Sequence, residues 1–475
     1  MTDTSRPGRR ASVTPQRRVD LLVALAVVAP AVVAISVGLV GGESNPTAGP
    51  QAPTTAALTS STVVCPAGLS GADGSVRVAR APDVAGGELA VASAPVTRGD
   101  ATTSPGDAVA VEQGRSIVVP RSDGATVLDG KGAAAPGIAA GRDGRLALPE
   151  CRAPGYDEWL VGVGASARSA TTVELVNPDD GDAVVDLVLH GDAGPVDEPA
   201  LRGLEVPPHG VRRIDLATLA PREKATAAHL TVVRGRVTAT ARTTYDPLGR
   251  GRVTTDFLPA DADPATDGLI LGVPAKPVRP TLHLANPGDD EVRVTPRFVT
   301  EDAAFTPSGA PEITVAPQSI RSVDLSSLLK GAAAQGVVGI QVEATAPVAS
   351  SFEALVQDDL VLLAPTPEVR EPTAVVVPTG AKTLVLGGAL RTGVVHVASY
   401  DPAGKELADE RVEIGPDRAA SVKLPSGAVA VTVEARNTRI RGVVALPTAG
   451  RTPGLATLRL RPAELQAQIP SVRPE

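Results

Sequence analysis

Two stretches of this sequence are copies of each other and decide its fold: TTVELVNPDDGDAVVDLVL at 171–189 and RPTLHLANPGDDEVRVTPRF at 279–298. A second shared motif follows each, LEVPPHGVRRIDLATL at 204–219 and ITVAPQSIRSVDLSSL at 313–328. One offset of 109 residues relates the matched positions: Asn177 to Asn286, Pro178 to Pro287 and Asp215 to Asp324. An ungapped offset over this length indicates an internal duplication.

Both copies carry the sequence pattern of short β-strands joined by tight turns. Alternating apolar and polar residues rich in valine, as at 184–190 and 237–243, predict strands. The Asn-Pro pairs predict tight turns, in which Asn caps the strand and Pro fixes φ. We expect Asp215 and Asp324 to cap short helical turns through backbone N–H groups rather than to bind a ligand.

The fold class predicted from this pattern is all-β. About seven strands per 100 residues are typical of an immunoglobulin-like or fibronectin-like β-sandwich. We therefore expect tandem sandwich domains after an N-terminal transmembrane helix. The Cys–Trp–Cys core of true immunoglobulin domains is absent. A propeller is the alternative, but its blades run ~40–50 residues, about half of this repeat.

Two further copies are expected. A degenerate one has HVASYDPAG (396–404) in place of the Asn-Pro turn, IGPDRAASVKL (414–424) in place of the later motif, and a closing hairpin at 430–446. Residues 62–151 are interpreted as a more distant first copy.

The N-terminus predicts export and a membrane anchor. Residues 21–42 contain no charge, and 22 helical residues span ~33 Å, enough for a bilayer core. Five arginines precede this stretch, which places the N-terminus in the cytoplasm and the remaining chain outside. A cleaved signal peptide and a twin-arginine signal are the alternatives, but the apolar stretch is long and no A-x-A site follows it.

The predicted organisation therefore has eight parts. They are a cytoplasmic N-terminus (1–20), a transmembrane signal anchor (21–42), a disordered stalk (43–61), a first β domain with a disulfide (62–155), a second β-sandwich (156–262), a third (263–368), a degenerate fourth (369–463) and a tail (464–475).

Cys65 and Cys151 are the two cysteines of the chain. Outside the cytoplasm, such a pair predicts a disulfide. Two independent buried thiols are the alternative. A metal site is not expected there, because two thiolates need further ligands and no histidine lies between them.

The remaining residues predict no catalytic, cofactor or metal site. A net charge of −8 without a basic stripe argues against nucleic-acid binding. No two histidines have metal-ligand spacing, and Ser166 lies outside a G-x-S-x-G motif. We expect a protein that is not an enzyme.

Three residues remain as binding candidates. Arg212 and Arg321 suit an anionic glycan, but solvated strand positions are the expected reading. Trp159, the single tryptophan, suits a sugar platform; we expect it instead at the junction of the first and second domains.

The cysteine pair, the WLVGVG strand at 159–164 and the repeated N-P-D…R-x-Ψ-D-L motif resemble a family of actinobacterial envelope proteins of unknown function. Members are often encoded near cell-wall glycosyltransferases. The resemblance implies a cell-envelope setting and carries over no functional residue. The expected function is a membrane-anchored envelope scaffold that presents its β-sandwich surfaces to an envelope protein or a cell-wall glycan. The alternative is a non-catalytic glycan-binding accessory protein of cell-wall synthesis.

Overall fold

The structure is a computed structural model that describes residues 54–69, 74–95, 99–119, 124–221, 223–261, 263–330, 335–450 and 452–469. The expected cytoplasmic N-terminus and membrane span lie outside these residues, as does the stalk up to residue 53. In the described part, no helix is long and apolar enough to cross a membrane. Near the C-terminal end of the stalk that was expected to be disordered, Thr54–Ala57 forms a strand (β1), which pairs with Gln466–Ile469 (β36).

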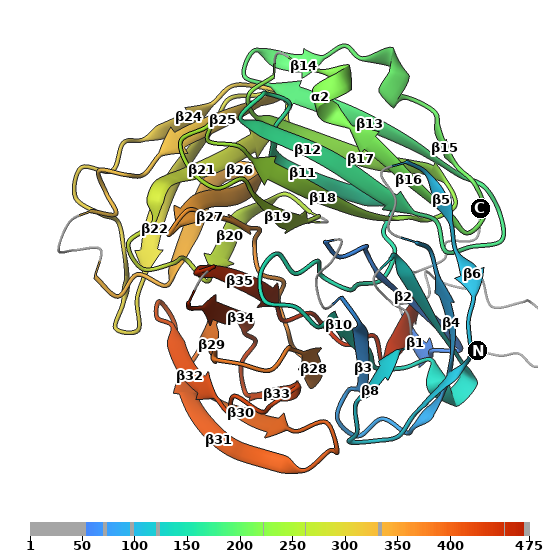
Figure 1. Ribbon diagram of the computed structural model, residues 1–475. Coiled ribbons are helices and arrows are strands. Elements are labelled where there is room, and N and C mark those ends of the chain that lie inside the picture. Colours follow the sequence, from blue (N-terminus) through green and yellow to red (C-terminus); the bar gives the residue numbers. More distant parts are fainter. Residues whose placement is uncertain are drawn as a thin grey trace, which may run out of the picture. The chain divides into compact units, whose positions relative to one another are not determined.

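Antiparallel strands dominate the described chain, so the all-β prediction is confirmed (Figure 1). Residues Ala57–Ala467 form one compact part of the chain. Within it, we distinguish four repeats by their strand order, and we number them along the sequence.

The second repeat contains two antiparallel sheets. Its strands are β11 (Asp157–Val163), β12 (Ser169–Val176), β13 (Ala183–Gly191), β14 (Gly194–Val196), β15 (Leu204–Val206), β16 (Gly210–Asp215), β17 (Thr226–Arg234), β18 (Thr238–Tyr245) and β19 (Thr254–Pro259), with short helices η2 (Pro199–Leu201) and α2 (Leu216–Leu219). One sheet has the order β11-β17-β13-β14, with β15 also on β13, and the other has the order β19-β18-β12-β16. The two sheets share one core, to which Leu160, Leu187, Val173 and Ala241 belong.

The fourth repeat has the same order of strands. Its strands are β28 (Thr373–Val376), β29 (Lys382–Gly387), β30 (Gly393–Tyr400), β31 (Glu406–Ile414), β32 (Ala420–Leu424), β33 (Ala430–Arg436), β34 (Arg441–Thr448) and β35 (Gly454–Arg459). Its sheets are β28-β33-β30-β31 and β35-β34-β29-β32, which match the second repeat position by position.

The third repeat follows the same order, although its two sheets are joined. Its strands are β20 (Ala265–Leu271), β21 (Val278–Asn286), β22 (Val292–Val299), β23 (Ala304–Phe305), β24 (Ile313–Val315), β25 (Ser319–Asp324), β26 (Gly339–Val356) and β27 (Asp359–Leu363). The long strand β26 stands for both β17 and β18, pairing with β20 and β22 in its first part and with β21 and β27 in its second.

The strands of the first repeat follow the same order. It comprises β2 (Ser60–Cys65), β3 (Val76–Arg80), β4 (Gly87–Ser93), β5 (Ala101–Thr102), β6 (Ser104–Pro105), β7 (Val109–Val111), β8 (Ile117–Val119), β9 (Thr126–Lys131), η1 (Gly132–Ala134) and β10 (Ile138–Arg142). Its sheets are β2-β9-β4-β6, with β7 also on β4, and β10-β3-β8. Among the described residues, β19 has no counterpart here.

The strand order corrects one alignment in the fourth repeat. The Asp401-Pro402 turn was expected to replace Asn177-Pro178, which connects β12 to β13. It instead connects β30 to β31, the counterparts of β13 and β14. The match was wrong because an acidic or amide residue before Pro suits many turns, so the dipeptide does not identify one turn among several.

Neighbouring repeats pack through equivalent faces. We name equivalent strands after those of the second repeat, so that a β17-type strand is one in the position of β17. The first strand of one repeat and its β17-type or β13-type strand contact the sheet of the next repeat that contains the β12-type strand. The contacting residues are Val64 and Val127 with Val176 and Val211; Trp159 and Ala227 with Ala285 and Ile320; Leu269 and Val299 with Val385, Ala419 and Val443; and Val376 and Ala430 with Ala79 and Ala139.

The last of these four sets joins the fourth repeat back to the first, so the contacts form a closed circuit. A head-to-tail interface that is used repeatedly closes when its rotation fits the number of copies. Alternation along the strands explains how both faces are buried. In β11, Leu160 faces the core of its own repeat, whereas Trp159 and Val161 face the third repeat.

Candidate functional site

Three consecutive residues between the first and second repeats each bind a different part of the chain. Cys151 forms the disulfide with Cys65 of the first repeat, so the predicted disulfide is present. Arg152 binds Glu158 of the second repeat, with one contact of 2.6 Å from Nη2, and donates to the Ala239 carbonyl at 2.7 Å. Glu150 binds the end of the fourth repeat.

The partner of Glu150 is Arg459. Arg459 donates to Glu150 Oε2 from two of its nitrogens, from Nε at 3.1 Å and from Nη2 at 2.7 Å. Arg461 Nη1 lies 3.4 Å from Glu150 Oε1. The Glu150 and Arg459 side chains are 8% and 5% exposed, so this is a buried ion pair.

Arg459 also binds the chain segments that follow the second and third repeats. Its Nη1 donates to the Pro365 carbonyl at 2.6 Å, and Nη2 donates to the Ala260 carbonyl at 3.2 Å. Burial alone would raise the pKa of Glu150, but the charges of Arg459 and Arg461 outweigh it, and this pKa is lowered. The carboxylate therefore stays ionised. We call Glu150, Arg459 and the carbonyls of Ala260 and Pro365 the central junction.

Two buried aspartates lie where the second and third repeats meet. Asp256 Oδ2 accepts the N–H of Leu362 at 2.8 Å, and Asp359 Oδ1 accepts the Thr254 hydroxyl at 2.9 Å. Burial raises the pKa of both carboxyls, that of Asp256 well above its ordinary value. The adjoining cavity, lined by Asp256, Glu150 and Arg459, holds about 20 Å³, room for about one water molecule.

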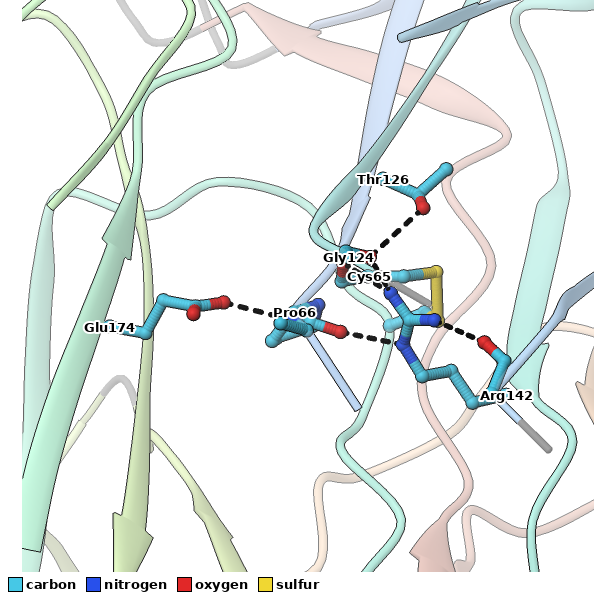
Figure 2. Close-up of a disulfide and its surroundings, with 9 residues drawn as sticks. Cys65, Pro66, Gly124, Thr126, Arg142 and Glu174 are labelled. Atoms are coloured by element: carbon cyan, nitrogen blue, oxygen red, sulfur yellow. Dashed lines mark hydrogen bonds between the residues drawn. A yellow bond between two sulfur atoms is a disulfide. The ribbon is translucent and has the colours of Figure 1, made fainter. Parts of the chain in front are cut away.

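The disulfide lies beside a buried arginine (Figure 2). Arg142 Nε donates to the Pro66 carbonyl at 2.6 Å, and its guanidinium also binds the carbonyls of Gly74 and Gly124. On the other side, Glu174 of the second repeat accepts the N–H of Ala67 at 2.9 Å. Segment 65–67 is therefore held from both the first and the second repeats.

The two predicted Asn-Pro turns have the same hydrogen bonds. Asn177 Nδ2 donates to the carbonyls of Gly181, Val206 and Pro207, at 2.8, 3.0 and 3.0 Å. Asn286 Nδ2 donates to the counterparts Asp290, Val315 and Ala316, at 2.7, 3.2 and 3.1 Å. Each Asn Oδ1 also accepts the N–H two residues on, and Pro178 or Pro287 occupies the intervening position. Each asparagine amide thus joins its turn to the residues just before the β16-type strand of the same repeat.

The predicted aspartates lie at the ends of β16 and β25. Asp215 Oδ1 accepts the N–H of Ala217 at 3.0 Å and caps α2. Asp324 Oδ1 accepts the N–H of Ser326 at 2.7 Å, at the start of a hydrogen-bonded turn. These bonds to Ser326 lower the pKa of Asp324.

Trp159 is buried, but at a different junction from the expected one. It packs between the second and third repeats, with Ala285, Ile320 and Ala349. The prediction that Trp159 packs at the junction of the first and second repeats was wrong. It relied on the position of Trp159 just after the boundary between them in the sequence, but the side chain points out of the second repeat towards the third. The ring stacks on His229, with centroids 4.2 Å apart.

The two repeated arginines differ in their surroundings. Arg212 Nη1 donates to the Glu205 carbonyl at 2.6 Å. Its counterpart Arg321 is exposed and lines a groove of about 530 Å³ with Lys224 and Glu223. A second groove, of about 740 Å³, lies between the first and fourth repeats and is lined by Arg77 and Arg145 among others. Within the described ranges, no three His, Cys, Asp or Glu side chains gather in a metal-binding cluster.

Sequence reasoning did not identify Glu150, Arg459, Asp256 or Asp359. None belongs to a motif, and the partners are far apart along the chain, 309 residues in the case of Glu150 and Arg459. Glu150 and Arg152 flank Cys151, which was the one signal available near the junction.

A sequence match covers most of these features. The chain belongs to DUF5719, a family of unknown function whose model matches residues 103–425. This match contains the second and third repeats with both Asn-Pro turns, and it bears out the expected membership in a family of unknown function. No curated protein and no solved structure matches the chain. The DUF5719 match gives neither an actinobacterial origin nor a cell-wall gene neighbourhood, and both stay expectations.

Proposed function

We propose that this protein is a non-catalytic scaffold of the cell envelope, which presents its four β repeats to partners as one rigid body outside the membrane. The central junction is the observation that carries the proposal. One buried guanidinium, that of Arg459, binds Glu150 ahead of the second repeat and the carbonyls of Ala260 and Pro365, which follow the second and third repeats. Such a junction suits a protein whose surfaces must keep fixed relative positions.

The proposed location has two supports. The uncharged stretch at 21–42, preceded by arginines, suits a signal anchor with the repeats outside the cytoplasm. The disulfide between Cys65 and Cys151 suits an oxidising compartment. The membrane is therefore the first proposed partner, and an envelope protein is the second.

We further propose that each repeat is a variant of the immunoglobulin-like sandwich. In one sheet a β17-type strand pairs with a β13-type strand, and in the other a β12-type strand pairs with a β16-type strand. This arrangement suits the immunoglobulin-like class. The variant differs at the edges, because the first strand pairs with the β17-type strand, where an immunoglobulin domain has its last strand.

Glycan binding is the second candidate, and the groove of about 740 Å³ favours it. Arg145 is exposed there, and the lining includes Thr379 and Thr448. A guanidinium with nearby hydroxyl groups suits an acidic sugar. Trp159 does not support this role, since the residue is only 4% exposed.

Photo-crosslinking in intact cells tests the scaffold proposal. A photoreactive residue is placed at exposed positions of each repeat, and crosslinked products are identified after membranes are isolated. We expect the protein in the membrane fraction, accessible to protease from outside, and one recurring envelope protein among its products. Cytoplasmic location, or co-sedimentation with purified cell-wall glycan in place of any crosslinked protein, would contradict the proposal.

A further inference from the structure

His190 lies where the second repeat packs on the third, and it contacts both. Its ring centroid is 5.3 Å from that of Trp159, and its Nδ1 is 3.0 Å from the carbonyl oxygen of Gln318 in the third repeat. The residue is 4% exposed. His190 is therefore part of the contact between the two repeats and not of the surface that faces solvent.

The bond to Gln318 determines where a further proton on His190 would go. A carbonyl oxygen only accepts hydrogen bonds, so Nδ1 of the neutral ring carries the hydrogen and Nε2 carries none. His190 Nε2 is buried, and no atom of the described residues forms a hydrogen bond with it. Protonation would therefore place an N–H and a positive charge at a buried position without an acceptor, which costs free energy while the contact stays closed.

The charged groups around His190 do not supply this acceptor. The neighbouring strand β11 contributes the uncharged Trp159, and β17 contributes His229, whose Nε2 lies 2.9 Å from Asp157 Oδ1. The adjoining groove of about 530 Å³ adds two carboxylates and two cations, those of Asp192, Glu223, Lys224 and Arg321. Burial, with a smaller contribution from His229, lowers the pKa of His190 below 6.5, although the bond to Gln318 opposes this.

The imidazole is specific to this interface among the four. The offset of 109 residues places Val299 at the same position in the third repeat, where it packs against the fourth. His190 pairs across the sheet with the β17-type strand, and the same pairing places Ala92 in the first repeat and Tyr400 in the fourth. The contact between the second and third repeats is thus the one that can respond to a histidine here.

Two buried aspartates at the same interface respond to pH in the opposite sense. Burial raises the pKa of Asp256 and Asp359, so the stability that they contribute falls as the pH rises. The lowered pKa of His190 makes its contribution complete above about pH 6.5, and that contribution is lost as the pH falls below this value. A variant of His190 therefore separates the two effects.

We propose that the contact between the second and third repeats is a pH-sensitive switch, in which protonation of His190 separates its ring from Gln318 and exposes Trp159 in an acidic medium. In a neutral medium the contact is closed, and the two repeats keep fixed relative positions. The inference concerns regulation of the scaffold, and for that meaning it rests on the proposed function.

The fluorescence of Trp159 tests the proposal on the full-length protein in detergent, because the chain has one tryptophan. We expect the emission maximum to move reversibly to longer wavelength, and acrylamide quenching to increase, as the pH falls from about 7.5 to about 5, with a midpoint below 6.5. His190→Val, which introduces the residue type of the equivalent Val299, should keep Trp159 buried. His209→Gln, which introduces the residue type of the equivalent Gln318, is the matched control and should respond as the parent does.

NMR of the histidine-labelled parent gives a second readout, which does not depend on whether His190→Val folds. The ring of His190 should gain its charge over the same pH range in which the emission of Trp159 shifts. A constant emission down to about pH 5, a charged His190 beside a buried Trp159, or an equal shift in His190→Val would overturn the proposal. Loss of the shift in His209→Gln or in Asp256→Asn would also overturn it. None of these results depends on where the protein resides in cells, so the scaffold proposal is tested separately.

Discussion

Glu150 and Arg459 are 309 residues apart in sequence, and their side chains form a buried ion pair with N–O distances of 2.7 and 3.1 Å. The same guanidinium binds the carbonyls of Pro365 and Ala260. Removing either charge would leave the other buried and unpaired, so the pair's contribution to stability is expected to be strongly cooperative.

Replacing one partner should therefore destabilise the protein. We expect Glu150→Gln or Arg459→Met to lower the free energy of unfolding by about 3–5 kcal/mol. The double variant should cost less than the sum of the two, because no unpaired charge remains. Urea denaturation of the four proteins measures the cycle. Arg115→Met, which removes an exposed ion pair with Glu112, is the control and should change stability by less than about 1 kcal/mol. Additive effects of the two junction variants would argue against a shared role.

The disulfide should stabilise the junction through Cys151. It joins residues separated by 86 positions, for which chain entropy predicts about 4.6 kcal/mol. Replacing both cysteines by Ala should lower stability by this order. It should also speed hydrogen exchange at Glu150 and Arg152, which flank the lost bond. Unchanged exchange at these two amides would show that Arg142 and the neighbouring bonds hold the segment without the disulfide.

The two Asn-Pro turns should respond alike to the same change. Asn177→Asp removes the amide donor and leaves three carbonyls facing a carboxylate, so we expect a loss of at least about 2 kcal/mol. Asn286→Asp should cost about the same. Asp401→Asn is the matched control, because its Oδ1 still accepts the N–H groups of Ala403 and Lys405. Thermal unfolding compares the three variants, and a large loss at only one of the two asparagines would contradict their equivalence.

Asp256 should make stability depend on pH. Its pKa in the folded protein is raised by burial above the ordinary 3.8. The folded state therefore keeps this proton at pH values where the unfolded state has lost it, and stability falls as the pH rises from 3.8 through the raised pKa. Asp256→Asn lacks this titration, so its stability relative to the parent should improve as the pH rises. Denaturation from pH 4 to pH 8 measures the difference, and parallel profiles for the two proteins would contradict the raised pKa.

The duplicated motifs predicted much of the local structure. The shared offset indicated that Asn177 and Asn286 perform the same task, and the two residues make matching hydrogen bonds. Period-two alternation was enough to predict strands, because each strand has one face in the core of its own repeat.

The contacts between repeats could not be predicted in the same way. Val176, Ala285 and Val211 are small apolar residues, and nothing in the sequence separates a residue that faces its own core from one that faces the next repeat. The pairing of Glu150 with Arg459 depends on closure of the whole circuit, and single charged residues without a motif carry no signal of their partner. The turn at Asp401 was misassigned for a related reason, since common turn chemistry fits several turns equally well.

The central claim is that the four repeats form a closed circuit held at Glu150 and Arg459. Small-angle X-ray scattering of the chain from residue 54 onward tests it most directly. For the compact part Ala57–Ala467, the scaling for a single compact body predicts a radius of gyration of about 22 Å. A value near this would support the circuit, and Glu150→Gln should increase it if the junction opens. A value roughly twice as large, as expected for four separate 100-residue domains in a row, would contradict the account.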